Sequence, residues 1–361
     1  MNRKEFLKLV IMSIAGFIAI SVLAGCGGDT PDNNGNGGGS NNGGGNNSGN
    51  LEESTKIIRF GLSTDVHQDY YPGMEYKIKT FAEKMNAEKV DFVIDLGDFV
   101  LPKDANDLFF ANWNLFNGPR YNVIGNHDCE YSSKATWMDY VGFTKNAGVR
   151  KGYYSFDVEG YHFVVLDLNY GMLNGTIVPF ESNNGSKYDS VYYINDEQLQ
   201  WLKKDLQETN KRTIIFSHEV MPRDMKNFEA LRLVIREANK SAKKVIAAFS
   251  GHWHVNREEY IDGVVHITLN SMAGYYVAAS FDNKSIYSHY GSENMKKYVN
   301  LKRSIPYDEP LFSLIELDPV KKQIVINGTG TYQNYIGDSP ETLGVINKGI
   351  TSFIPTTTYN Y

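Results

Sequence analysis

The chain has 361 residues, of which 42% are hydrophobic and 22% charged, which is ordinary for a globular protein with a sizeable core. Its net charge of −6 gives no support to nucleic-acid binding, because a polyanion is repelled overall, although a bound cation can still attract a small anion. The two cysteines are too few for a disulfide framework.

The first 25 residues have the features of a signal peptide. Arg3 and Lys4 give a basic start, and the apolar stretch from Leu9 to Leu23 is short for a membrane span. The ending Leu23-Ala24-Gly25-Cys26 resembles the bacterial lipobox, which implies cleavage before Cys26 and a lipid on its thiol. The alternatives are a plain N-terminal membrane anchor and an ordinary signal peptide. The lipoprotein interpretation places the protein in the bacterial cell envelope, extracytoplasmic and attached to a membrane.

A flexible linker is predicted after this leader. Residues 27–50 are almost all Gly, Asn, Ser and Asp, so they offer no apolar surface to offset the entropy lost on ordering. We therefore divide the chain into a signal peptide (1–25), a lipidated cysteine with a linker (26–54) and a folded domain (55–361). The linker has a root-mean-square reach of roughly 25–30 Å. The tail from about Tyr332 either covers the core or lies at the periphery.

The folded part begins with strand–helix alternation and continues with hairpins. Hydrophobic periodicity and turn residues predict these elements in chain order: strand 57–62, helix 73–88, strands 92–94 and 121–124, hairpin 153–158/162–168, a helix capped by Asn195, strand 213–216, helix 228–240 capped by Asn227, strand 245–249, hairpin 259–261/264–269 about Asp262-Gly263, and the late strand pair 312–317/323–326. This order is typical of a layered α/β protein with partly mixed sheets.

Five short polar segments each follow an apolar strand. They are Asp65-Val66-His67, Gly97-Asp98, Gly125-Asn126-His127-Asp128, His218, and Gly251-His252-Trp253-His254. Ligands of open α/β sheets bind at the carboxyl ends of the strands, so we expect these segments to converge. Carboxylate, imidazole and amide ligands without thiolate suit Mn, Fe or Zn. The carboxylate of Asp98 offers enough lone pairs to bridge two cations.

These five blocks, in this order, resemble the calcineurin-like metallophosphoesterase family, which includes purple acid phosphatases and cyclic-nucleotide phosphodiesterases. The resemblance covers roughly residues 57–275. One block alone is weak evidence, but five in order, each after an apolar strand, form a specific pattern. The resemblance implies an α/β fold in which two mixed β-sheets pack as a sandwich flanked by helices.

The resemblance also implies a role for each motif residue. Asp65, His67 and His254 hold one metal ion, Asn126, His218 and His252 hold a second, and Asp98 bridges them. His127 lies beside the metals as a proton donor or charge stabiliser, and Asp128 orients its ring. A hydroxide between the metals is the expected nucleophile.

The sequence departs from the family pattern after the bridging residue. A further Asp or Asn often stands three residues later, where this chain has Leu101. Among the other polar residues, Asp95 is expected to support the loop without binding metal, and His162 and His266 to pack inside the fold. Trp253, Tyr275 and Tyr276 are candidates for stacking on a substrate, although packing is the commoner role of an aromatic side chain.

The pattern predicts metal-dependent hydrolysis of a small phosphomonoester or phosphodiester, with no nucleic-acid partner. The alternative is a non-catalytic, metal-containing surface lipoprotein that binds without turnover. The pair His127 and Asp128 argues against that alternative, because pure binding needs no proton donor.

Overall fold

The computed structural model describes residues 51–143, 151–181, 187–330 and 335–361, which belong to one compact unit. The predicted signal peptide, Cys26 and most of the linker lie outside these residues. Across the ranges described, we find no helix with the length and apolar character needed to cross a membrane.

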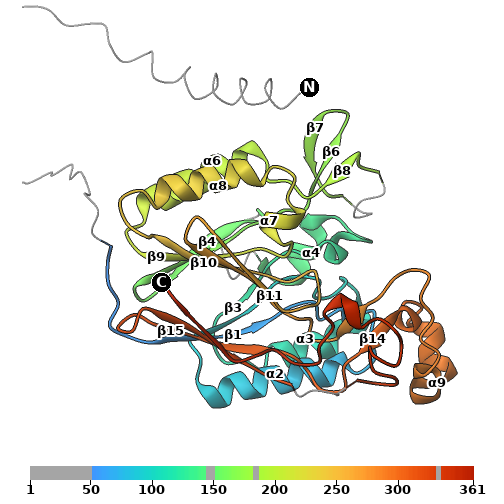
Figure 1. Cartoon of the computed structure of the whole chain (residues 1–361). Helices are drawn as coiled ribbons and strands as arrows, with labels where there is room; N and C mark the ends of the chain where they lie inside the picture. The colour runs from blue at the N-terminus through green and yellow to red at the C-terminus, as the bar shows by residue number, and fades with distance from the viewer. Residues whose placement is uncertain (1–50, 144–150, 182–186, 331–334) are drawn as a thin grey trace, which may run out of the picture. The chain divides into compact units, whose positions relative to one another are not determined.

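The first sheet is mixed and has the order β17-β16-β15-β1-β2-β3 (Figure 1). Strands β1, β2 and β3 are parallel, and β15, β16 and β17 extend the sheet by antiparallel pairing. Phe60 lies opposite Phe92 in the parallel part. The bounds are β1 Ile58–Ser63, β2 Phe92–Asp95, β3 Arg120–Asn122, β15 Ser313–Asp318, β16 Gln323–Gly328 and β17 Thr357–Asn360.

The second sheet has the order β11-β12-β10-β9-β5-β4. Its four inner strands are parallel, and a hairpin strand closes each edge. The predicted turn at Asp262-Gly263 is confirmed, with positive φ at both residues. The bounds are β4 Tyr154–Val158, β5 Tyr161–Val165, β9 Arg212–Phe216, β10 Val245–Ser250, β11 Arg257–Ile261 and β12 Val264–Thr268.

The two sheets pack face to face through an aromatic core. The Phe60 ring of β1 stacks on Phe92 at 4.8 Å and meets the edges of Phe163 and Phe216, from the other sheet, at 5.8 and 5.9 Å. All four side chains are fully buried. Such ring pairs add to the free energy gained by burying apolar area. The predicted sandwich of two mixed sheets is therefore confirmed.

Helices cover both outer faces of the sandwich (Figure 1). Helix α2 lies against the first sheet, where Met85 packs so closely on Gly61 that a Cβ there would lie 2.4 Å from its sulfur. Helices α6 and α8 bury Leu202 and Leu231 against the second sheet. The helical segments are α2 Met74–Glu88, η1 Asp104–Asn106, α3 Asp107–Trp113, η2 His127–Cys129, α4 Lys134–Tyr140, α6 Asp196–Glu208, α7 Met221–Asp224, α8 Phe228–Ala238, α9 Ile286–Lys297, η3 Leu301–Arg303 and η4 Ile346–Lys348.

One predicted helix cap is confirmed and the other is wrong. Asn195 Oδ1 accepts a hydrogen bond from Gln198 N at 2.9 Å, as expected of an N-cap. Asn227 makes no cap bond to α8. Its side-chain amide instead pairs with the backbone N–H and C=O of the buried Ile194, which supplies both partners at once.

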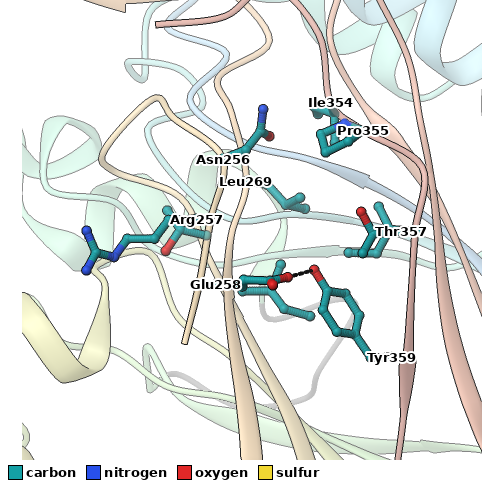
Figure 2. Close-up of a pocket in the computed structure, with 11 residues that line it drawn as sticks. Asn256, Arg257, Glu258, Leu269, Ile354, Pro355, Thr357 and Tyr359 are labelled. Carbon is teal, nitrogen blue, oxygen red and sulfur yellow. Dashed lines mark hydrogen bonds between the residues drawn. The ribbon is translucent and has the colours of Figure 1, made fainter. Parts of the chain in front are cut away.

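The described part of the C-terminal tail belongs to the fold. Strand β17 adds to the edge of the first sheet, and Tyr359 OH donates to the carboxylate of Glu258 on β11 of the second sheet. Figure 2 shows this bond beside a pocket of about 270 Å³ between the two sheet edges. The tail thus covers the open side of the sandwich.

Short elements that sequence periodicity did not predict complete the molecule. A three-stranded ribbon comprises β6 Tyr170–Leu173, β7 Thr176–Pro179 and β8 Ser190–Val191, and a two-stranded ribbon comprises β13 Gly274–Tyr276 and β14 Ser304–Pro306. Helix α9 lies beside β14 (Figure 1).

Candidate metal centre

The five polar segments lie on loops that leave the carboxyl ends of β1, β2, β3, β9 and β10. The predicted ligands are all buried except His252, which is partly exposed. The parallel strands of both sheets therefore deliver these side chains to one end of the sandwich, as the strand-end argument predicted.

The first candidate group is Asp65, His67 and His254. Nε2 of His254 lies 3.1 Å from Asp65 Oδ1 and 3.1 Å from His67 Nε2. His67 Nε2 lies 3.9 Å from Asp65 Oδ1. Three donor atoms thus surround one point, at separations that a shared cation accommodates.

The second candidate group is Asp98, His218 and His252. Nε2 of His218 lies 3.1 Å from Asp98 Oδ2 and 3.2 Å from His252 Nδ1. The same Oδ2 of Asp98 is 3.7 Å from His67 Nε2 in the first group. Asp98 therefore stands between the two groups, as a bridging ligand must.

The atoms behind the ligands orient them toward the centre. Nδ1 of His254 contacts the carbonyl of Gly274 at 2.6 Å, and Nδ1 of His218 contacts that of Leu96 at 2.9 Å. Since a carbonyl only accepts, both Nδ1 atoms carry the proton and both Nε2 lone pairs face the centre. Asp65 Oδ2 accepts from Thr64 Oγ1 and from the backbone N–H of His252.

Two oxygens at the centre are buried without a hydrogen-bond partner. They are Oδ1 of Asp65 and Oδ1 of Asn126. A buried acceptor without a partner is costly, and native proteins nearly always satisfy it. A cation bound beside each oxygen would satisfy it, so the two groups of residues fit two metal ions.

Burial and neighbouring charges favour the protonation state that binds metal, which is a neutral imidazole or an ionised carboxylate, in most of these groups. Burial lowers the pKa of His67 and of His252 to about 3, which leaves both imidazoles neutral at pH 7. Burial raises the pKa of Asp98, but the neighbouring histidines outweigh it and hold the pKa well below the usual range. For His218, burial lowers the pKa, but Asp98 and Asp65 raise it well above its usual value. A cation bound to His218 Nε2 would replace the second proton of this imidazole.

The backbone at this centre is strained. Asp65, His67, Asp98, His252 and His254 all have φ between 51° and 68°, a region that residues other than glycine rarely adopt. Such strain clusters at functional sites, where the surrounding structure enforces it.

The sequence profile of the calcineurin-like phosphoesterase family matches residues 58–256, more than half of the chain. The chain belongs to this family. A dimetal phosphatase from Danio rerio has a similar structure, with a TM-score of 0.53 and 19% sequence identity over 80% of this chain and 100% of that chain. A search of curated proteins returned no significant match.

Two further solved structures match with lower TM-scores. GAP50, described as the anchor in the inner membrane complex of Plasmodium, gives a TM-score of 0.46 and 16% identity over 81% of this chain and 92% of that one. A putative 5′-nucleotidase from Staphylococcus aureus gives 0.42 and 12% identity over 83% of this chain and 54% of that one.

In this phosphoesterase, the partner of His127 is Glu130. Glu130 Oε2 lies 2.8 Å from His127 Nδ1, and Tyr70 OH donates to the same oxygen. Burial lowers the pKa of His127, but Asp98 and Glu130 raise it more, so the net shift is upward. The sequence analysis missed Glu130. The available signal was the i, i+3 spacing of His127 and Glu130, which brings the two side chains to the same side of a helical turn.

The prediction that Asp128 orients the His127 ring is wrong. Its carboxylate makes no hydrogen bond to that ring and accepts four backbone hydrogen bonds, from Asp98, Phe99, Val100 and Gly125, at 2.8–3.2 Å. A carboxylate with four N–H donors has no lone pair left for an imidazole. Asp128 instead fixes the loop that carries Asp98.

Position 125 requires glycine, because the backbone there lies against Asp98. A Cβ at Gly125 would lie 2.1 Å from Asp98 N and 2.2 Å from Asp98 Oδ1, so any side chain there displaces the carboxylate of Asp98. Asp95, predicted to support this region, accepts from Ser63 Oγ at 2.8 Å and from Gly97 N at 2.9 Å.

A cavity of about 450 Å³ opens over the centre. His67, Asp98, His127, His252 and His254 line its floor, and its walls carry Tyr70, Tyr71, Glu130, Trp253, Tyr275, Tyr276, Asn300 and Arg303. The three aromatic residues suggested by the sequence thus face the cavity. By contrast, His162 lies elsewhere, between the carboxylates of Asp157 and Asp205. The pocket of Figure 2 contains none of the candidate ligands.

Proposed function

We propose that this chain is an exported, lipid-anchored, two-metal phosphoesterase that hydrolyses a small phosphomonoester or phosphodiester. The observation that carries the proposal is the position of Asp98 between two buried groups of ligands, beneath a cavity that admits a small molecule. Such an arrangement suits in-line displacement at phosphorus.

Each ligand has a place in this proposal. Asp65, His67 and His254 hold one cation, Asn126, His218 and His252 hold the other, and Asp98 contacts both. Oxygen and nitrogen donors without thiolate favour Mn, Fe or Zn. When bound, the two cations supply Lewis acidity and a water acidic enough to be deprotonated near neutral pH.

Side chains of the protein supply the proton that the leaving group needs. The ring of His127 lies at the cavity floor, where it donates a proton to the leaving oxygen. Glu130 holds that ring through Nδ1, which leaves Nε2 free to face the substrate. A site that only binds phosphate does not need this pair, so His127 with Glu130 favours turnover over the alternative of a binding lipoprotein.

The cellular location rests on residues outside the described structure. The basic start, the apolar stretch and the lipobox-like ending at Cys26, followed by a linker of Gly, Asn and Ser, support export and lipid attachment. The proposal predicts that Cys26→Ala abolishes detergent-phase partitioning and labelling with a fatty acid. Labelling that persists in this variant would contradict it.

The activity is tested with the full chain stripped of metal. Mn²⁺, Zn²⁺ or Fe²⁺ is added back in turn, and release is measured from p-nitrophenyl phosphate and bis-p-nitrophenyl phosphate. We expect metal-dependent release that Asp98→Ala abolishes, and the two substrates separate monoester from diester preference. Two bound metals per chain without release would favour the binding lipoprotein, and no bound metal would overturn the site assignment.

A further inference from the structure

Arg303 is the one lysine or arginine among the described residues that line the active-site cavity. Its Nη1 donates to Asn300 Oδ1 at 3.2 Å, and its Nε is buried with no hydrogen-bond partner. In the described part of the chain its guanidinium pairs with no carboxylate. Guanidinium N–H groups only donate, and buried ones are normally satisfied, so this group lacks an acceptor.

The β13–β14 ribbon fixes Arg303 relative to the metal centre. Arg303 directly precedes β14, and its carbonyl accepts from Val277 N at 2.9 Å. At the other end of the ribbon, Gly274 lies opposite Pro306, and its carbonyl contacts His254 Nδ1. Arg303 is three residues from Pro306, which at about 3.4 Å per residue is roughly 10 Å along the ribbon.

The wall of the cavity also carries aromatic side chains. Tyr275 and Tyr276 come from β13, and Trp253 stands between the ligands His252 and His254. The Trp253 ring is held on two sides, because its Nε1 donates to Asp224 Oδ1 at 3.1 Å and Arg257 lies over its face at 5.5 Å. A fixed ring of this kind suits contact with a flat or ring-shaped body.

We infer that the substrate carries a second oxyanion, a carboxylate or a phosphate, in the same cavity as the phosphoryl group that reacts, and that Arg303 binds it. This inference rests on the proposed function, because the metal centre takes the reacting phosphoryl group. A guanidinium pairs with an oxyanion through two parallel hydrogen bonds and charge, which a neutral acceptor does not reproduce. The aromatic wall then contacts the ring that joins the two anions.

The test compares aryl phosphates of one shape. The metal-loaded full chain is assayed with 4-carboxyphenyl phosphate, with hydroquinone bisphosphate and with the neutral 4-carbamoylphenyl phosphate, each also as its methyl diester. We expect kcat/KM to favour at least one doubly anionic probe over the carbamoyl probe by about tenfold or more, the size of one charge-assisted contact. Because the contact exists before and during reaction, the preference appears mainly in KM.

Variants assign the preference to one side chain. In Arg303→Gln, the ratio of kcat/KM for the doubly anionic probe to kcat/KM for the carbamoyl probe should fall to near one. Lys302→Gln removes the same charge from the preceding residue, which lines a different surface hollow, and should keep the ratio. A ratio near one in the wild type, or one that survives Arg303→Gln, overturns the inference. If none of the three probes is hydrolysed with any of the metals, the result contradicts the proposed function and not the role of Arg303.

Discussion

Replacement of Glu130 by glutamine tests whether this residue positions His127. The change removes one negative charge and keeps the size of the side chain. In the wild type, Glu130 Oε2 is 2.8 Å from His127 Nδ1. A hydrogen bond to a charged group contributes about 1.5–3 kcal/mol, and about 1.4 kcal/mol corresponds to a tenfold change in rate. We therefore expect kcat to fall about 10- to 100-fold where a proton must be donated.

The assay compares two leaving groups. An alkyl phosphate needs a proton on its leaving oxygen, whereas p-nitrophenolate departs as a stable anion. The fall in Glu130→Gln should therefore concentrate on the alkyl substrate, with the metal content unchanged. In the His127→Ala background the same change should add little, because both residues act on one proton. Tyr70→Phe, which removes only the second bond to Glu130, is the matched control and should cost less.

Two results would refute this reasoning. An equal fall for both leaving groups would show that Glu130 supports the site in general and not the proton transfer. Full additivity with His127→Ala would show that the two residues act independently.

Three further predictions concern stability and metal binding. Burial lowers the pKa of His162, but Asp205 and Asp157 raise it more, so its contribution is complete below the unfolded value of about 6.5 and is lost as pH rises through the folded pKa. The gap in urea stability between wild type and His162→Gln should therefore shrink between pH 6 and pH 9, and a constant gap would contradict this. Gly125→Ala should reduce bound metal and activity at least about tenfold, because its Cβ occupies the place of Asp98; equal metal content by atomic emission would refute it. Chelation should lower the melting temperature and Mn²⁺ should restore it, since a ligand that binds only the folded state stabilises it; calorimetry without such a shift would contradict two bound cations.

The parts of the fold that sequence predicted are those set by local pattern. The strands that lead to Asp65, Asp98, His218 and His252 are mostly apolar, because strands covered on both faces are mostly buried. Polar ligands placed directly after such runs lie at strand ends whatever the order of strands in the sheet. These strands run parallel within each sheet, so their carboxyl ends lie at the same edge and the ligands converge there.

The parts that sequence missed depend on partners distant in the chain. Strand β17 exists because β16 offers it an edge, and the Thr- and Tyr-rich tail shows no helical or alternating signal of its own. Asn227 has a typical capping position, yet its side chain pairs with the backbone of Ile194, a residue distant in the chain. Likewise, the donor set around Asp128 is four backbone N–H groups, which no side-chain pattern reveals.

The strained loops indicate that the protein, more than the metal, sets the geometry of this centre. Positive φ at a residue other than glycine costs on the order of 1–3 kcal/mol, and five ligands adopt it. Backbone hydrogen bonds between the loops hold this shape: Asp65 N donates to Gly97 O, His67 N to Asp98 O, and Gly251 N to His218 O, at 2.8–3.0 Å. Each bond joins two ligand loops, so a shift in one loop breaks a contact in another. The ligands are thus held near their binding positions by the sheet ends themselves, and the orphan oxygens of Asp65 and Asn126 mark where the cations complete the structure.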